Sequence, residues 1–173
     1  QLWTLDSRHS VLLGFAEHAV HKESVVPGAA TVCWALTAAQ RSGRSDVAVE
    51  DVTLSQLLFL PAGSDVKVQL VMTAEPNDGS RLHVYAATEG SAANGFTLHS
   101  QALLRPARLA SSPHYLNLAL LRRQQRTRVE RETIYQRLVQ RGLEHGPSYQ
   151  LLLHAEVGPG DALGALKPKR GAT

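Results

Sequence analysis

The sequence has one cysteine in 173 residues, few aromatic residues and no long apolar run. The lone Cys33 excludes an internal disulfide and gives no sign of an oxidising compartment. A membrane helix needs about 18 consecutive apolar residues, and the sequence never reaches that length. The start at Gln1 lacks an initiator Met and the basic-then-apolar pattern of a signal peptide. We therefore expect a cytoplasmic domain without membrane association, taken from a longer polypeptide.

Acidic residues are scarce in one part of the chain. Nine of the 18 Lys and Arg residues lie between Arg105 and Arg141, where the only acids are Glu130 and Glu132. Such a block suits an acidic partner, although a solvated linker and helix face would have the same composition. Nucleic acid is not an expected partner, because the aromatic interleaving, zinc-finger and RNP patterns are not found.

The composition, 43% hydrophobic and 19% charged, is that of a globular domain. A mostly buried helix is predicted between Gly28 and Gly43, with Pro27 at its entry, because apolar residues recur there at helical spacing. The recurring residues are Ala29, Val32, Cys33, Leu36 and Ala39. Strand-like stretches follow at 47–60, 66–73, 82–86 and 96–102. Apolar residues alternate with polar ones at 66–73 and 82–86, and a turn is predicted at Gly90–Gly95. One helix followed by an antiparallel meander predicts an α+β hot-dog fold, in which a curved sheet wraps a long central helix.

The rest of the chain is predicted to have less regular structure. Residues 105–129 are expected to form a connecting segment, and Glu130–Arg141 an amphipathic helix ended by Gly142. A strand is predicted at Leu151–Val157, followed by a short tail. The expected organisation is an N-terminal hot dog at 1–104, the connecting segment at 105–129, and an incomplete second hot dog at 130–173.

A histidine shortly before the predicted helix is the first candidate for chemistry. His18 lies nine residues before Pro27, which Gly28 follows. A neutral imidazole is a competent base near pH 7, and the N–H groups at a helix N-terminus can stabilise a developing oxyanion. Gly28 would let a substrate approach the backbone closely. The spacing suggests proton abstraction beside a carbonyl, with His18 as base and the Gly28 N–H as donor, although a structural histidine would fit the same spacing.

Two segments together resemble a known family. His18–Pro27 is similar to the HxxxGxxxxP motif of polyketide synthase dehydratase domains, which are double hot-dog enzymes. Gly142–Tyr149 resembles the family's GYxYGPxF motif, keeping Gly142, Gly146 and Pro147 and having Tyr149 in place of Phe. The motifs occur in the family's order, about 120 residues apart, with the predicted meander between them. The chain therefore resembles the first half of a double hot dog.

The resemblance implies removal of water from a β-hydroxyacyl thioester held on the phosphopantetheine arm of an acyl carrier protein. His18 would take the α-proton and the Gly28 N–H would stabilise the enolate-like oxygen. The expected substrate-binding residues are Pro27, Gly28, Gly146, Pro147 and Tyr149. No metal or soluble cofactor is implied. The expected partners are the carrier protein, neighbouring synthase domains and a second copy of the chain in a homodimer. The Arg-rich 105–141 region is a possible carrier-docking surface, to be tested by charge reversal at Arg122, Arg123 and Arg126.

The sequence departs from the family pattern at three places. Lys22 stands where the first motif has Gly, and Leu143 and His145 replace the aromatic residues of the second. None of the six Asp residues fits the family's DxxxQ or DxxxH pattern for the catalytic acid, so we expect that acid outside these residues.

These departures leave alternatives open. A dehydratase-like isomerase or cyclase would use the same histidine, and a silent structural domain would need neither the Gly nor the Asp. A free-standing thioesterase is disfavoured by the second motif. A zinc site at His18 and His21 is not expected, because their spacing matches no known zinc motif.

Overall fold

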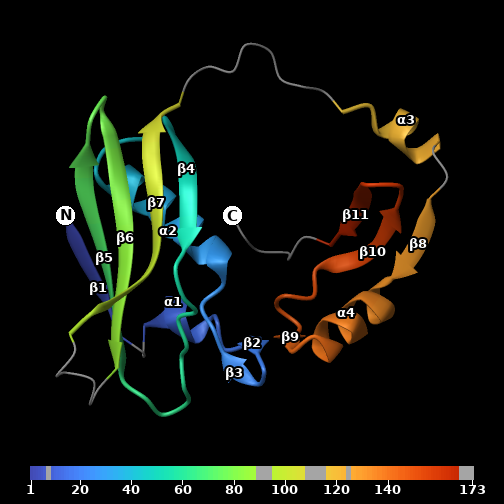
Figure 1. Cartoon of the computed structure of the whole chain (residues 1–173), viewed down its shortest axis with the longest axis horizontal. Coiled ribbons are helices and arrows are strands. Elements are labelled where there is room, and N and C mark those ends of the chain that lie inside the picture. Colours follow the sequence, from blue (N-terminus) through green and yellow to red (C-terminus); the bar gives the residue numbers. More distant parts are fainter. Residues whose placement is uncertain (7–8, 89–94, 108–115, 124–125, 168–173) are drawn as a thin grey trace. The chain divides into compact units, whose positions relative to one another are not determined.

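A computed structural model describes residues 1–6, 9–88, 95–107, 116–123 and 126–167, in two compact units that are coloured along the chain in Figure 1. Unit 1 comprises Gln1–Ala16 and Glu23–Leu109, and unit 2 comprises Glu17–Lys22 and Ala110–Thr173. Residues 17–22 thus group with the later part of the chain, which the division predicted from the sequence did not anticipate. Most of the turn predicted at Gly90–Gly95 lies outside the described residues, as do residues 108–115 and 124–125 of the connecting segment.

Unit 1 is built on a five-stranded antiparallel sheet with the strand order β1-β5-β6-β7-β4. The alternation of buried and exposed residues predicted at 66–73 and 82–86 is confirmed, because Val66, Val68, Leu82 and Val84 are buried. The strands are β1 Leu2–Leu5, β4 Val47–Leu54, β5 Val66–Glu75, β6 Gly79–Thr88 and β7 Thr97–Pro106.

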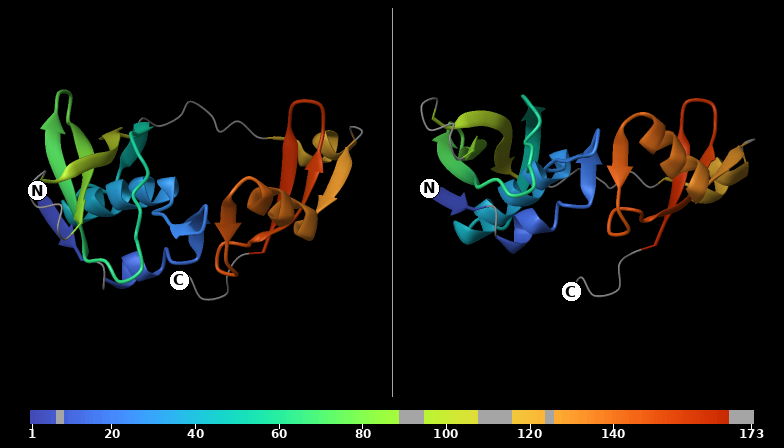
Figure 2. Two further views of the ribbon diagram at one scale, coloured as in Figure 1. Left: turned by 60° about the horizontal axis from the view of Figure 1, so that its bottom comes forward. Right: turned by 90° about the horizontal axis from the view of Figure 1, so that it is seen from below.

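The central helix of unit 1, α2 (Gly28–Arg41), packs against this sheet, as the two views of Figure 2 show. Its buried residues, which form the core with the sheet, are Ala30, Thr31, Trp34, Ala35, Ala38 and Ala39. The prediction of which residues of this helix are buried is largely wrong, because Cys33 is exposed and Leu36 is 43% exposed. Since α2 is apolar on most of its surface, hydrophobic spacing alone does not identify the side that contacts the sheet.

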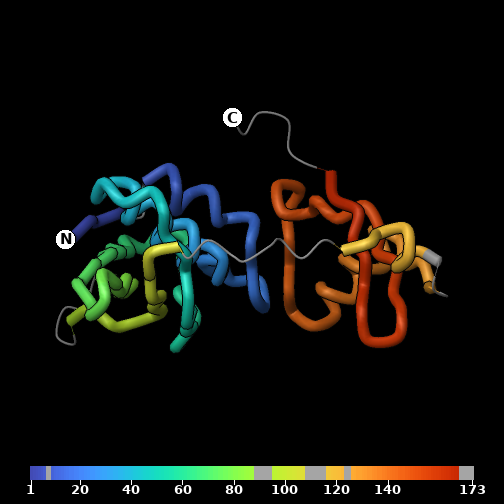
Figure 3. The backbone as a smooth tube through the Cα atoms, turned by 90° about the horizontal axis from the view of Figure 1, so that it is seen from above, coloured from blue at the N-terminus to red at the C-terminus, as the bar shows by residue number. Residues whose placement is uncertain are grey.

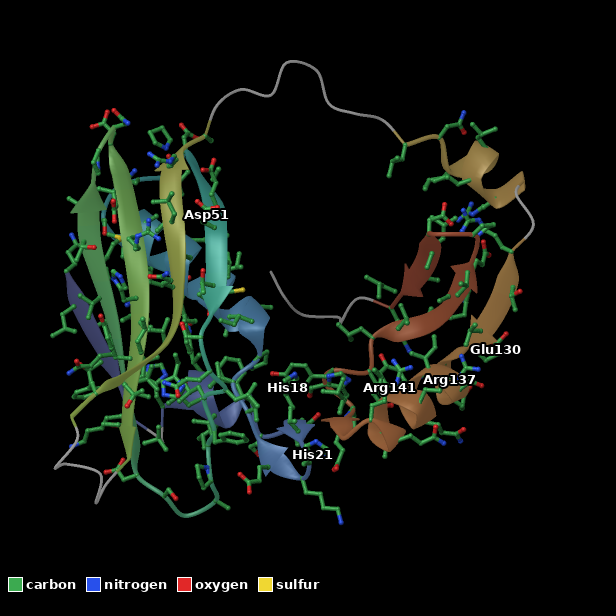
Figure 4. The ribbon with its side chains drawn as sticks, in the orientation of Figure 1. His18, His21, Asp51, Glu130, Arg137 and Arg141 are labelled. Carbon is green, nitrogen blue, oxygen red and sulfur yellow. The ribbon has the colours of Figure 1, made fainter. Side chains whose placement is uncertain are left out.

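Polar and irregular features complete unit 1. The buried hydroxyls of Thr31 on α2 and Ser100 on β7 lie 2.7 Å apart and share a hydrogen bond. The first predicted strand is shorter than expected, since β4 ends at Leu54, and a bulge with Asp51 at φ 46° interrupts its pairing with β7 (Figure 4). A short helix that the sequence did not predict, α1, spans Ser10–Leu13, and β3 spans Glu23–Ser24.

The described part of unit 2 contains three short antiparallel strand pairings and two helices. Strand β10 pairs with both β8 and β11, and β2 pairs with β9. The β10–β11 hairpin is the red loop of the backbone trace in Figure 3. The predicted helix is confirmed as α4, and Gly142 follows it at φ 77°, as expected of a helix-ending glycine. The elements of unit 2 are β2 His18–Val20, α3 Leu118–Arg123, β8 Thr127–Glu130, α4 Arg131–Gln140, β9 Leu143–His145, β10 Leu152–Val157 and β11 Ala162–Leu166.

Three of these elements correct the sequence prediction. The connecting segment contains α3 and β8, and the predicted tail contains β11. Each is six residues or shorter, which is too short for a hydrophobic period to be recognised. Among the described helices, none is long and apolar enough to cross a membrane.

Candidate active site

The pairing of β2 with β9 brings the two sequence motifs together within unit 2. His18 lies directly opposite His145 in this antiparallel pair. The pairing continues past the strand end, where the His21 N–H donates to the carbonyl of Gly142 at 2.7 Å. Residues that are more than 120 positions apart in sequence are therefore neighbours in one small sheet.

Four rings make up the cluster around the predicted base. The ring centre of His18 lies 5.2 Å from that of His145 and 5.5 Å from that of Tyr149. Tyr149 stacks on His145 at 6.2 Å, and Tyr135 of α4 meets His145 edge-on at 6.3 Å. Burial raises the pKa of the Tyr149 hydroxyl, and the Glu17 carboxylate raises it further, so Tyr149 remains protonated at neutral pH. His18 thus lies in an aromatic cluster built from both motifs.

Glu17 holds the turn that carries Tyr149. Its backbone carbonyl accepts from the Gly146 N–H at 2.7 Å, and its carboxylate Oε2 accepts from the Ser148 N–H at 2.6 Å. A Cβ on Gly146 would lie 2.7 Å from the Glu17 side chain, which explains the glycine. Pro147, predicted to contact substrate, is exposed between these anchored residues. The sequence did not predict this role of Glu17, because the role depends on a contact between distant segments.

The motif position occupied by Lys22 requires a left-handed backbone. His21 has φ 50° and Lys22 has φ 69°, and two successive positive values are the backbone of a type I′ turn. The second position of such turns favours glycine, because an L side chain crowds the backbone there. The Lys22 side chain is exposed. The family's glycine is therefore explained by the turn, and lysine occupies the position at a cost in backbone strain.

Pro27 and Gly28 lie in unit 1, at the start of α2. Pro27 is the N-cap residue, and it accepts a hydrogen bond from the Ala30 N–H at 2.8 Å through its carbonyl. No side chain caps this helix, so its first N–H groups are suited to an anionic oxygen. A Cβ on Gly28 would lie 2.7 Å from the Leu54 side chain. Close packing against Leu54 therefore explains why glycine occupies this position, in addition to the close approach of substrate that the sequence predicts.

A cavity of about 270 Å³ in unit 1 includes Pro27 and Gly28 in its wall. Its other walls are mostly apolar, and its polar residues include the hydrogen-bonded Thr31 and Ser100. His99 also lines it, with Nδ1 3.0 Å from the Leu57 carbonyl, and burial lowers the pKa of its imidazole. A larger cavity of about 550 Å³ in the same unit is lined by none of the predicted site residues.

The predicted site residues thus fall into two groups. His18, Gly146, Pro147 and Tyr149 belong to unit 2, whereas Pro27 and Gly28 belong to unit 1. The cooperation of His18 with the Gly28 N–H stays a prediction. No group of three or more His, Cys, Asp or Glu residues suited to a metal ion occurs among the described residues.

Comparison with known proteins identifies the family. The family described as "Polyketide synthase dehydratase domain" matches residues 1–87, and the family described as "Polyketide synthase dehydratase N-terminal domain" matches residues 114–173. The chain belongs to the polyketide synthase dehydratase family. It is 32% identical over 136 residues to the mycoketide-CoA synthase of Mycobacterium tuberculosis and, over the same length, to the polyketide synthase GfsA of Streptomyces halstedii. Each match covers 78% of the chain but only 2–3% of the relative.

Solved structures confirm the hot-dog fold. A trans-AT polyketide synthase dehydratase domain from Brevibacillus brevis matches with a TM-score of 0.82 at 18% identity, covering 96% of this chain and 62% of that one. The dehydratase domain from the CurK module of curacin polyketide synthase matches with a TM-score of 0.79 at 22% identity, covering 94% and 56% respectively. Two further CurK structures are of variants described as inactive, one with His replaced by Phe and one with Asp replaced by Asn.

Proposed function

We propose that this chain contributes the base to a dehydratase site of a modular polyketide synthase. The site removes water from a β-hydroxyacyl thioester on an acyl carrier protein and leaves an α,β-unsaturated thioester. His18 takes the α-proton as a neutral imidazole. The Gly28 N–H, at the uncapped start of α2, stabilises the negative charge that develops on the thioester oxygen. A carboxylic acid outside the motifs of this chain protonates the departing hydroxyl.

The observation that carries this proposal is the cluster around His18. The first motif supplies His18, and the second supplies the residue opposite it and the ring of Tyr149. Packing by these rings restricts the orientation of the His18 imidazole, as proton transfer by a positioned base requires. The inactive His-to-Phe variant of the CurK dehydratase supports an essential histidine in that relative.

The cavity beside Gly28 suits the acyl part of such a substrate. Its mostly apolar wall would accept a hydrocarbon chain, and its volume of about 270 Å³ is small. The hydrogen-bonded hydroxyls of Thr31 and Ser100 could meet a polar group on that chain. We propose that the chemistry needs no metal or soluble cofactor, because the phosphopantetheine arm delivers the substrate. We also propose that the protein works in the cytoplasm as a homodimer within the synthase.

Replacement of His18 tests the proposal in the full-length protein. His18→Ala should lower the rate of water loss from a β-hydroxyacyl carrier protein by about 10²–10⁴-fold, the range for loss of a general base. His83→Ala, which changes a partly exposed histidine on β6, is the matched control and should keep the rate. Undiminished product formation by His18→Ala would contradict the proposal and indicate a silent structural domain.

Product analysis separates the dehydratase from its enzymatic alternatives. Only loss of water lowers the mass of the acyl group by one water molecule and creates an α,β double bond. An isomerase would move a double bond without a change in mass, and a cyclase that adds a hydroxyl to an alkene would likewise conserve mass. A His18-dependent product of unchanged mass would replace the dehydratase assignment with one of these alternatives.

The basic face of α4 is the proposed docking surface for the acidic carrier protein. Arg137 and Arg141 are four residues apart and exposed, and Figure 4 labels both. Arg126, included in the surface predicted from sequence, does not fit this role. Its side chain is only 4% exposed and forms an ion pair with Asp161 at 2.7 Å.

Charge reversal tests this surface. The double variant Arg137→Glu, Arg141→Glu should raise KM for the carrier-bound substrate about tenfold and leave kcat unchanged. Charges at the edge of an interface mainly affect the rate at which the two proteins associate. The same variant should process a free pantetheine thioester normally. Lys67→Glu, at an exposed lysine of β5, is the control. An unchanged KM for the carrier-bound substrate would remove α4 as the docking surface.

A further inference from the structure

His145 occupies a position in the second motif where the family has an aromatic residue, and it lies opposite the proposed base. Directly opposed residues of an antiparallel pair project from the same face of the sheet. The rings of His18 and His145 accordingly lie 5.2 Å apart, tilted by 41°. This geometry places a second titratable imidazole against the first.

The surroundings of His145 disfavour a charge on its ring. Tyr149 stacks on one side at an interplanar angle of 19°, and Tyr135 meets the ring edge-on. Its Nδ1 atom is the one buried side-chain nitrogen or oxygen of the described residues that lacks a hydrogen-bond partner. A protonated imidazole has two N–H donors, so the charged form would bury a donor without an acceptor.

The charged and titratable groups around His145 are few. Strand β2 presents His18, and the preceding Glu17 has its carboxylate already engaged by the Ser148 N–H. Helix α4 presents Tyr135, and the guanidinium of Arg131 lies 5.9 Å from the centre of that ring. The turn after β9 presents Tyr149. Within the described part of unit 2, no carboxylate is paired with the His145 ring.

We propose that His145 is a positioning residue for His18, an uncharged imidazole whose ring packs against the base and holds it in orientation. This inference rests on the proposed role of His18. Burial lowers the pKa of His145, and the charge of a protonated His18 lowers it further. When His18 accepts the α-proton, its neighbour therefore carries no charge that would oppose the transfer.

Hydrogen–deuterium exchange at the imidazole Cε1, followed by mass spectrometry, measures the pKa of each histidine in the full-length protein. His145 should titrate below the ordinary value of 6.5. In His18→Phe its pKa should rise, because the repelling charge is gone while a ring remains. His18→Asn provides a second, polar replacement in case the Phe variant does not fold. A His145 pKa that is the same in wild type and in the folded variants would overturn the coupling.

Kinetics tests the positioning role. His145→Ala should lower kcat about tenfold with KM within about twofold, as expected when a base loses its orientation. His145→Phe and His145→Tyr retain a ring and should recover most of the lost kcat. In wild type, a plot of log(kcat/KM) against pH should have slope one on its acid side and slope two at still lower pH, where the second imidazole also protonates. In His145→Phe the slope should remain one. An unchanged kcat in His145→Ala would contradict the inference.

The two proposals can fail separately. Loss of activity in His18→Ala without coupling between the imidazoles would leave the dehydratase proposal intact and remove the role of His145. Coupled imidazoles with full activity in His18→Ala would remove the base and, with it, the function assigned to the pair.

Discussion

His21 and Gly142 lie in direct contact where β2 and α4 end. The His21 N–H donates to the Gly142 carbonyl at 2.7 Å, and a Cβ on Gly142 would lie 2.3 Å from Cε1 of the His21 ring. Gly142 also has φ 77°. Glycine is therefore favoured at this position both by the backbone conformation that ends α4 and by the ring that lies against it.

Gly142→Ala should lower the free energy of unfolding by about 2–3 kcal/mol. Alanine is strained in a left-handed conformation, and its Cβ would displace the His21 ring from its rotamer. Gly160→Ala is the matched control, because Gly160 has φ 86° and an added Cβ there would meet nothing within 4 Å. It should cost only about 1–2 kcal/mol. In a His21→Ala background the cost of Gly142→Ala should fall to the control value. Chemical denaturation measures all four variants, and equal costs in both backgrounds would contradict the contact.

Lys22→Gly should stabilise the protein. Lys22 has φ 69°, and relief of this strain outweighs the conformational entropy of glycine by about 0.5–1 kcal/mol. Glu23→Gly is the control at the next, exposed position, which does not have a positive φ. It should destabilise by about 0.5–1 kcal/mol. Thermal unfolding compares the two, and destabilisation by Lys22→Gly would show that the turn is not strained by lysine.

Arg126→Ala should be costly for stability. The guanidinium forms an ion pair with Asp161 and donates to the carbonyls of Leu121 at 2.7 Å and Glu156 at 3.2 Å. Loss of these charged hydrogen bonds should lower the free energy of unfolding by roughly 2–3 kcal/mol. Arg122→Ala, at an exposed arginine, should change it by less than about 0.5 kcal/mol. Similar urea midpoints for the two variants would argue against a structural role for Arg126.

His99 should make the fold sensitive to acid. Burial lowers the pKa of His99 below 6.5 in the folded state, so the unfolded chain binds the proton first as the pH falls. Stability is then fully present above the unfolded pKa and declines below it, by at most about 1.4 kcal/mol per pH unit. His99→Asn retains an N–H donor for the Leu57 carbonyl but does not titrate. Its urea stability should decline less on acidification than that of wild type, and parallel declines would contradict the prediction.

The sequence predicted the features that depend on local pattern. Alternation identified the buried residues of β5 and β6, because successive side chains of a strand point to opposite faces. The positions of the glycines also carried information, since Gly142 ends α4 as expected. The pattern of one helix followed by a meander predicted the hot-dog fold, and the two motifs in their order predicted the family.

Other features depended on contacts that no local pattern specifies. The buried face of α2 was mistaken because apolar residues occur around most of the helix, and only packing against the sheet selects Trp34 over Cys33 and Leu36. The short elements α1, α3, β8 and β11 escaped prediction because each is too short for a repeating pattern to be recognised.

The candidate site shows the same division. By itself, the sequence determined that His18, Pro27 and Tyr149 belong to motifs of one family, and that Lys22 departs from the pattern. Only the tertiary structure decided that His145 lies opposite His18, that Glu17 holds the turn of Tyr149, and that Lys22 occupies a left-handed turn. The physical reason is that strand register and backbone conformation arise from hydrogen bonds between residues far apart in the chain, and these bonds form only when the whole unit folds.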